Sequence, residues 1–331
     1  MGPVASGENA IKTNQTKVFD LRQEISVIYH FDSGLPSSGT NLKIFLSLLL
    51  LLAASGLYGQ DRKVDPTWLH RYVPDLTEAK VSSASPACHY KAIFGEGDSE
   101  ERILRSVSRF AEITVDAHGT CQSERYDREE ELYFILAGNP TLHYGDQSYP
   151  LRANDFTYIS PSMRHSIENS SGEPAQFILM GFKIPAKISI DSPPSQPKIV
   201  NLDALKEETV GGHPTSVLYK LLAGPRTGKR DAIDQAYVVT SLFWMDFAPG
   251  GTNFPHHHET AEEIYLVIDG EGDMVAGGGV NGIEGRHPAK AGDAYYFRSN
   301  CTVGFYNQDK AGAKAHILAV RSLIPLPQEE D

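Results

Sequence analysis

The segment from residue 256 to residue 263 holds side chains that bind metal ions. It reads His-His-His-Glu-Thr-Ala-Glu-Glu, so His256 and His258 are two positions apart and Glu263 follows five positions later. On an extended strand, residues two apart point to the same face, which predicts that these two imidazoles project together. A turn through Thr260 and Ala261 would return the chain and bring Glu263 to the same space. Two neutral imidazoles and a carboxylate suit a divalent cation; Mn²⁺ is the expected ion, with Fe²⁺, Ni²⁺ and Zn²⁺ as alternatives.

The segment that carries the proposed carboxylate ligand occurs twice in the chain. Glu131-Leu-Tyr-Phe-Ile-Leu-Ala-Gly138 and Glu263-Ile-Tyr-Leu-Val-Ile-Asp-Gly270 both begin with Glu, have Tyr two residues later and end with Gly, and they lie 132 positions apart. Further along, Asn154-Asp155 matches Gly292-Asp293, and Asn169 matches Asn307, at a spacing of 138 positions. The extra residues fall in the Gly-rich segment 275–285, where a longer loop costs little. We therefore interpret the chain as an internal duplication of one domain.

Short apolar segments separated by Gly, Pro, Asn and Asp run from Leu104 onward, which is typical of the strands of a sandwich or barrel. The 29 Gly and 20 Pro residues also favour a turn-rich, all-β protein. We predict two tandem β-barrels, an N-terminal one over residues 88–186 and a C-terminal one over residues 201–327. Residues 187–200 are Pro-rich and read as the linker. One short helix is expected near Asp65–Tyr72.

The pattern Gly250-x5-His256-x-His258-x4-Glu263-x6-Gly270 resembles the first motif of the cupin superfamily at every fixed position, and Gly292-Asp293 with Asn307 resembles the second. The first copy is similar through Glu131, Gly138, Asn154-Asp155, Pro161, His165 and Asn169. The resemblance covers residues Leu104–Leu326. It implies a bicupin, in which two jelly-roll-like cupin barrels share one chain, and the layout is similar to that of the manganese-dependent ureidoglycine aminohydrolases.

Each copy departs from the full cupin ligand set. Glu124 and Tyr126 stand in place of the two motif histidines of the first copy, which leaves Glu131 and His165. We expect no tight metal site there and interpret Glu131 and His165 as a buried pair left from an ancestral site. In the second copy Val303 stands at the position of His165 and cannot bind a metal. Three protein ligands remain, and substrate and water would complete the coordination sphere.

Further side chains are candidates for the second pocket. Tyr265 shares a strand face with Glu263 and is expected to line the pocket and donate a hydrogen bond. His316 lies in the last predicted strand on the face of Leu318 and is expected to point into the barrel. There it is a possible fourth ligand, or an interior histidine held by hydrogen bonds, which we favour. Glu262 is expected to face solvent.

Charge and cysteine content exclude several classes of function. With 42 acidic and 30 basic residues, the chain has a formal charge of −12, which repels phosphate backbones and excludes nucleic acid as an expected partner. Its three cysteines form no CxxC pair, so a zinc ribbon is excluded and at most one disulfide can form.

An apolar run over residues 44–54 follows Lys43 and precedes Ser55 and Gly56. The run is too short to cross a bilayer, so no stable membrane anchor is expected, and its flanks predict a secretory signal peptide over residues 42–59. Residues 1–41 lie upstream of it and are not expected to be part of the folded protein. The expected location is secreted or periplasmic; a buried core helix and a cytoplasmic location are the alternative.

We therefore predict a metal-dependent bicupin enzyme that acts on a small organic substrate of the carboxylate, ureide or enol type. The reaction would use Lewis-acid or O₂-dependent chemistry, as in an aminohydrolase, dioxygenase or decarboxylase. The alternatives are a non-catalytic binder of a small ligand, in which Val303 marks a decayed metal site, and a storage-type bicupin. A homodimer is a possible assembly, because exposed strand edges tend to pair.

Overall fold

The computed structural model describes residues 65–278 and 284–325. These residues are mostly strands, which confirms the predicted all-β class, and their helical turns are the short 3₁₀ segments η1 (Val73–Asp75), η2 (Glu101–Ile103) and η3 (Leu202–Ala204). In these ranges no helix has the length and apolar character needed to span a membrane. The predicted signal peptide over residues 42–59 and the segment 1–41 lie outside the described residues.

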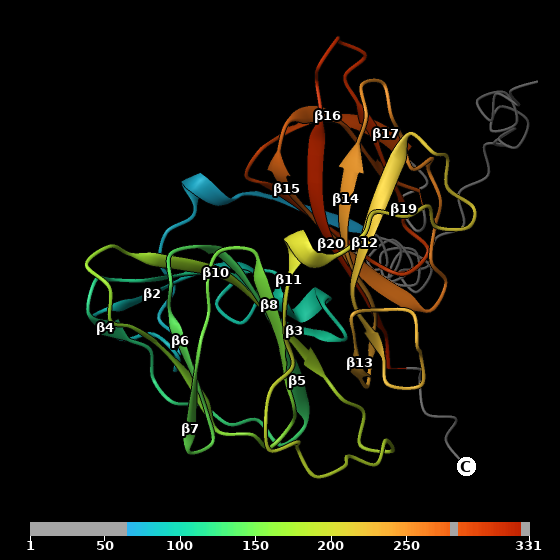
Figure 1. Cartoon of the computed structure of the whole chain (residues 1–331). Helices are drawn as coiled ribbons and strands as arrows, with labels where there is room; N and C mark the ends of the chain where they lie inside the picture. Colours follow the sequence, from blue (N-terminus) through green and yellow to red (C-terminus); the bar gives the residue numbers. More distant parts are fainter. Residues whose placement is uncertain (1–64, 279–283, 326–331) are drawn as a thin grey trace, which may run out of the picture. The chain divides into compact units, whose positions relative to one another are not determined.

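Two sheets close the first barrel, which is drawn largely in green in Figure 1. The larger sheet has the order β11-β8-β5-β10-β3-β2 and the smaller one β4-β9-β6-β7. Their strands are β2 (Cys88–Gly95), β3 (Val107–Val115), β4 (Gly119–Thr120), β5 (Glu129–Ala137), β6 (Thr141–Tyr144), β7 (Gln147–Pro150), β8 (Asp155–Ile159), β9 (His165–Asn169), β10 (Ala175–Lys183) and β11 (Ile199–Asn201).

The second barrel repeats this arrangement. Its larger sheet has the order β1-β18-β15-β20-β14-β12-β13 and faces the sheet β17-β16-β19. The strands are β1 (Trp68–Tyr72), β12 (Val217–Pro225), β13 (Ile233–Ala236), β14 (Val239–Phe247), β15 (Ala261–Asp269), β16 (Glu271–Gly277), β17 (Glu284–Lys290), β18 (Asp293–Phe297), β19 (Thr302–Asn307) and β20 (Ala315–Leu323).

Strand alternation divides the apolar residues into three cores. On β15, Tyr265 and Val267 face the interior of the second barrel, whereas Ile264 and Leu266 face a core shared by the two larger sheets. The interior of the first barrel holds a third cluster, which includes Tyr133 of β5. Because both faces of the larger sheets are buried, their strands read as almost continuous apolar runs in the sequence.

Each barrel receives the strand that precedes the other barrel in the chain. β1 comes before the first barrel but pairs with β18 of the second, and β11 comes before the second barrel but pairs with β8 of the first. The short helix expected near Asp65–Tyr72 is therefore a strand, since pairing with β18 satisfies its backbone hydrogen-bonding groups. The boundaries expected from the sequence also change: β11 extends the first barrel into the expected linker, and the second barrel gains the lead-in segment.

Several repeated residues close turns. Gly138 and Gly270 have φ angles of +84° and +83°, and a Cβ atom at either would lie within 2.8 Å of the neighbouring strand's backbone. Asn169 and Asn307 each donate from Nδ2 to three backbone carbonyls. Part of the sequence likeness between the two halves therefore has a structural cause: the glycines fit a tight turn with a positive φ, and the asparagines bind backbone carbonyls.

Two buried glutamates join the barrels. Glu262 of β15 accepts hydrogen bonds from the backbone N–H groups of Arg105 and Ser106, at 2.8 and 2.9 Å, and from the Tyr296 hydroxyl. Glu130 of β5 accepts from the N–H groups of Val238 and Val239 in the same way. Glu262 is 1% exposed, so the expectation that it faces solvent is wrong. Its neighbour on the outer face of the barrel is the other barrel rather than water.

Candidate metal centre

Three side chains converge at the second barrel. His256 and His258 lie in the loop before β15, Glu263 lies on β15, and one ligand atom from each can be chosen so that all three lie within 4.8 Å of one another. His258 Nε2 is 3.2 Å from Glu263 Oε2. These are the three residues that sequence spacing singled out. Within residues 65–278 and 284–325 no other group of His, Cys, Asp or Glu meets this criterion.

The loop backbone orients His256. Its N–H and C=O both pair with Val303 of β19, and its Nδ1 lies 2.8 Å from the carbonyl oxygen of Phe254. A carbonyl can only accept, so Nδ1 carries the proton and Nε2 keeps the lone pair that a metal ion needs. Phe254 reaches this geometry at a φ of +54°, an unusual conformation for a bulky residue. The strained loop therefore determines which imidazole nitrogen is free.

Burial and nearby charges shift the pKa values of His256 and Glu263. Burial lowers the pKa of His256, which keeps its imidazole neutral near pH 7. Burial alone would raise the pKa of Glu263, but His258 and the positive charge of Arg321 outweigh it and the net shift is downward. A neutral imidazole and an ionised carboxylate are the forms that bind a divalent cation.

Arg321 and Tyr219 are additional residues of this interior that sequence reasoning missed. Nη1 of Arg321, on β20, lies 3.2 Å from His258 Nε2, and β20 places Arg321 directly opposite Glu263. Tyr219, on β12, is 2% exposed, and its hydroxyl has no hydrogen-bond partner in the described part of the chain. No sequence motif includes either residue. The residue of the first barrel that corresponds to Arg321 is Gly181, because each of the two pairs with the motif glutamate of its own barrel.

A family model described as the cupin domain matches the chain twice, at residues 111–181 and 243–320. The chain is a bicupin. Both matches lie within the two barrels described above, and both include the acidic residue of the motif, Glu131 in the first and Glu263 in the second. The predicted cupin resemblance is confirmed for both copies.

Two curated proteins are similar to parts of this bicupin. Germin-like protein subfamily 2 member 4 of Arabidopsis thaliana is 30% identical over 122 residues, which are 37% of this chain and 50% of that protein. Oxalate-binding protein of Thermotoga maritima is 25% identical over 80 residues, 24% of this chain and 66% of that protein. The bicupin thus spans about half of the first relative and about two thirds of the second.

Solved structures share the two-barrel architecture. The Ylba protein of E. coli has a TM-score of 0.58 and 13% identity, covering 83% of this chain and 98% of that chain. The oxalate decarboxylase of Lactobacillus farciminis, solved as a formate complex, has a TM-score of 0.57 and 13% identity, covering 80% of this chain and 88% of that chain. At such identities the likeness shows the fold alone.

The first barrel of the bicupin has an arginine beside its motif glutamate. Arg109 is 3% exposed, and its Nη2 lies 3.1 Å from Glu131 Oε1 and 2.6 Å from Glu129 Oε2. His165 Nε2 lies 2.7 Å from the other Glu131 oxygen. The guanidinium thus supplies the positive charge that a metal ion would supply beside Glu131. The β-bridge between Glu124 and His165 matches the bridge between His256 and Val303, which agrees with the alignment of the two copies.

His316 does not lie in the second barrel's interior. On β20 the inward residues are Ile317 and Ala319, and His316 lies on the opposite face, where its ring stacks on Trp244. Its Nε2 is 3.6 Å from Asp246 Oδ2. The prediction that it points inward is wrong, because both faces of β20 are apolar and Leu318 belongs to the core between the barrels. His316 is therefore not a fourth ligand.

Tyr265 does face the interior of the second barrel. It is 2% exposed, and its hydroxyl accepts a hydrogen bond of 2.9 Å from Nδ2 of Asn253. The carbonyl oxygen of Asn253 in turn lies 2.8 Å from Nδ1 of His213, whose ring packs edge-on against His256. Tyr265 is thus tied to the loop that carries the histidines, while its own proton remains available for donation.

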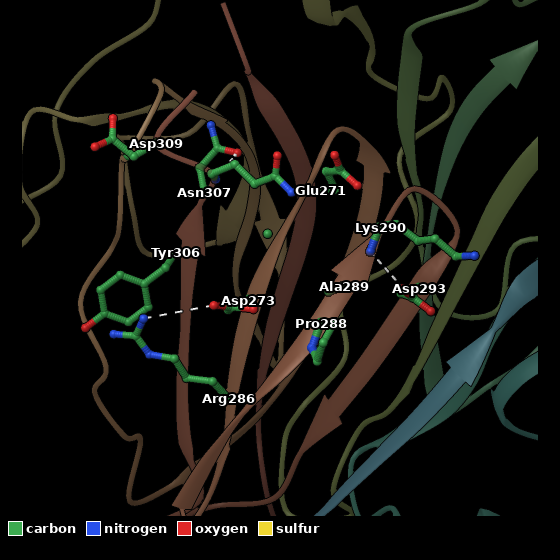
Figure 2. Close-up of a pocket in the computed structure, with 13 residues that line it drawn as sticks. Glu271, Asp273, Arg286, Pro288, Ala289, Lys290, Asp293, Tyr306, Asn307 and Asp309 are labelled. Carbon is green, nitrogen blue, oxygen red and sulfur yellow. Dashed lines mark hydrogen bonds and ion pairs between the residues drawn. The ribbon is translucent and has the colours of Figure 1, made fainter. Parts of the chain in front are cut away.

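A cavity of about 750 Å³ opens elsewhere, on the outer face of β16, β17 and β19. Figure 2 shows Arg286 stacked on Tyr306 and joined to Asp273, with Glu271 and Asp309 nearby. Its lining holds four carboxylates and two cationic side chains, Arg286 and Lys290. The cavity shares no residue with the histidine and glutamate group.

Proposed function

We propose that the second barrel binds one divalent metal ion through His256, His258 and Glu263 and uses it to act on a small organic substrate. The observation that carries this proposal is the convergence of two imidazoles and a buried carboxylate within 4.8 Å. The donor set fits such an ion, since the Phe254 carbonyl leaves Nε2 of His256 free and the Glu263 carboxylate is ionised.

A bound divalent ion would act as a Lewis acid that polarises a substrate oxygen, and Mn²⁺ is the ion we favour. The residues around it would do the remaining work. Tyr265 and Tyr219 offer hydroxyl groups to the interior, which is otherwise lined by apolar side chains of the barrel. One relative and one structural neighbour described above carry oxalate in their names, which supports a small organic acid as the substrate class.

Metal analysis of the purified protein tests this proposal. We expect about one Mn, Fe, Ni or Zn ion per chain, lost in a His256→Ala/His258→Ala variant because one carboxylate alone binds weakly. The matched control is His143→Ala in the first barrel, whose ring pairs with Glu168 and which should keep its metal. A wild-type protein that stays metal-free after incubation with each ion would overturn the proposal.

The alternative is a binder of a small ligand without catalysis, which the presence of Val303 at the fourth ligand position favours. The same preparation decides between the two. Metal-free protein that binds small acids normally would support the binder, whereas metal-dependent turnover of a small acid or ureide would support the enzyme.

We also propose that the protein is secreted or periplasmic. The disulfide between Cys88 and Cys121 supports this location, because such bonds persist in oxidising compartments. A homodimer remains a prediction, and light scattering of the purified protein would test it.

A further inference from the structure

Each barrel places one guanidinium beside its motif glutamate, but from a different strand. Three neighbouring strands align Glu131, Gly181 and Arg109 in the first barrel, and Glu263, Arg321 and Ser241 in the second. In the first barrel the outer strand supplies the arginine, which reaches over Gly181; a Cβ atom there would lie 3.1 Å from its Nε. In the second barrel the middle strand supplies it.

The surroundings of the two guanidinium groups differ in charge. Arg109 has carboxylate oxygens of Glu129, Glu131 and Glu96 at 2.6, 3.1 and 3.5 Å. The residue 132 positions after Glu129 is Ala261, so the second barrel lacks this acid. The first barrel therefore neutralises its arginine internally.

The hydrogen-bond partners of Arg321 are two hydroxyls and one imidazole. Its Nε lies 3.1 Å from Thr240 Oγ1, its Nη2 3.0 Å from Ser241 Oγ, and its Nη1 3.2 Å from His258 Nε2. Within residues 65–278 and 284–325, no carboxylate forms an ion pair with it. A half-buried guanidinium fixed by hydroxyls keeps the capacity to bind an anion.

We propose that Arg321 is the anion-binding residue of the second barrel and that the ligand taken there is a small carboxylate. One carboxylate oxygen would face the guanidinium, and the unpartnered hydroxyl of Tyr219 is a second buried donor in the same interior. This inference rests on the proposed function and deepens it by assigning the residue that binds the carboxylate of the substrate. A neutral amide or ureide would bring no charge to face Arg321, whose neighbouring carboxylate, Glu263, is also a proposed metal ligand.

The outer cavity of Figure 2 is the rival anion site, and its charges argue against it. Arg286 already lies 3.8 Å above the Tyr306 ring and 4.0 Å from an Asp273 oxygen. Its four carboxylates outnumber its two cationic groups, so the cavity repels a small anion. Arg286 is therefore the matched control for Arg321.

Calorimetric titration of the full chain, with and without Mn²⁺, tests the proposal. The probes are acetate and malonate, compared with acetamide and malonamide. Wild type and Arg286→Gln should bind the carboxylates at least about tenfold more tightly than the amides, and Arg321→Gln should lose this preference while keeping the metal content of wild type. Arg321→Lys should retain part of the preference, because it keeps the charge without the planar fork.

A second variant tests the same inference if Arg321→Gln does not fold. Ala261→Glu adds the acid that neutralises Arg109 in the first barrel, so it should weaken carboxylate binding about tenfold with Arg321 still present. Equal binding of carboxylates and amides by wild type, or unchanged carboxylate binding in both variants, would overturn the inference. Failure to bind any metal would overturn the proposed function instead, and the titration without metal would still test Arg321.

Discussion

Glu131 and His165 form a buried pair whose two shifted pKa values contribute to the pH response of the first barrel. Burial alone would raise the pKa of Glu131, but His165 and Arg109 outweigh it, and the pKa lies below its ordinary value of 4.5. Burial alone would lower the pKa of His165, but the Glu131 carboxylate outweighs it, and the pKa lies above 6.5. Both charged forms are therefore stabilised by folding.

The pair should stabilise the protein most in mild acid. The Glu131 contribution is complete above 4.5 and is lost as the pH falls through its lowered pKa. The His165 contribution is complete below 6.5 and is lost as the pH rises through its raised pKa. Urea unfolding of wild type and Glu131→Gln/His165→Gln should thus differ most near about pH 5.5 and less near about pH 8.5. A difference that does not change with pH would show that the pair is not charged.

Spacing predicted which histidines and which glutamate converge in the second barrel but not which other groups reach them. His256, His258 and Glu263 lie within eight residues of one another in the sequence, and the bridge from His256 to Val303 holds the loop with the two histidines close to β15. Arg321 comes from a strand paired across the sheet, and its position depends on register that no single segment encodes. His316 was misplaced because neither face of its strand is polar enough to mark the outside.

At the scale of elements, each of the two buried glutamates binds a loop of the other barrel: Glu262 binds the segment before β3, and Glu130 binds the segment before β14. Glu130 and Glu262 are 132 positions apart, the same spacing as the motif acids beside them, so the two contacts are equivalent parts of the duplication. Each carboxylate accepts several backbone N–H groups that would otherwise be buried without partners.

Glu262→Gln should lower the free energy of unfolding by about 2–4 kcal/mol, because its amide group replaces an acceptor that faces N–H donors. Glu130→Gln should cost a similar amount. Chemical denaturation measures both, and the exposed neighbour Glu259→Gln, which lies in the adjacent loop, should change stability by less than about 0.5 kcal/mol. Losses no larger than that of the control would mean that the barrels are held by apolar contact alone.

The strand class followed from turn residues and apolar runs, and the all-β, two-barrel prediction is confirmed. The sequence did not predict which strands β1 and β11 pair with. β1 and β11 are short and flanked by Pro, so the sequence around them resembles a linker, and only the free edges of β18 and β8 show where they pair. Such pairing is a tertiary effect that local propensity does not contain.

At the scale of the whole molecule, the disulfide between Cys88 and Cys121 closes a loop of 33 residues in the first barrel. A loop of that size predicts a stabilisation of about 3–4 kcal/mol, mainly through the unfolded chain. Cys88→Ser/Cys121→Ser should lose about this amount in urea denaturation, and a reducing agent should weaken wild type but not the variant. If wild type were equally stable with and without the reducing agent, the bond would not form in solution.

The placement of β1 and β11 also has a consequence for how the duplication arose. A single repeat cut from this chain would carry a leading arm with no sheet to receive it and a sheet edge with no arm to cover it. In a pair of such repeats, the leading strand of each one pairs with the sheet edge of the other, which is the arrangement of a domain-swapped pair. Joined in one polypeptide, the two repeats cannot separate and can therefore diverge: the first has Arg109 beside its motif glutamate, whereas the second has two histidines beside its own.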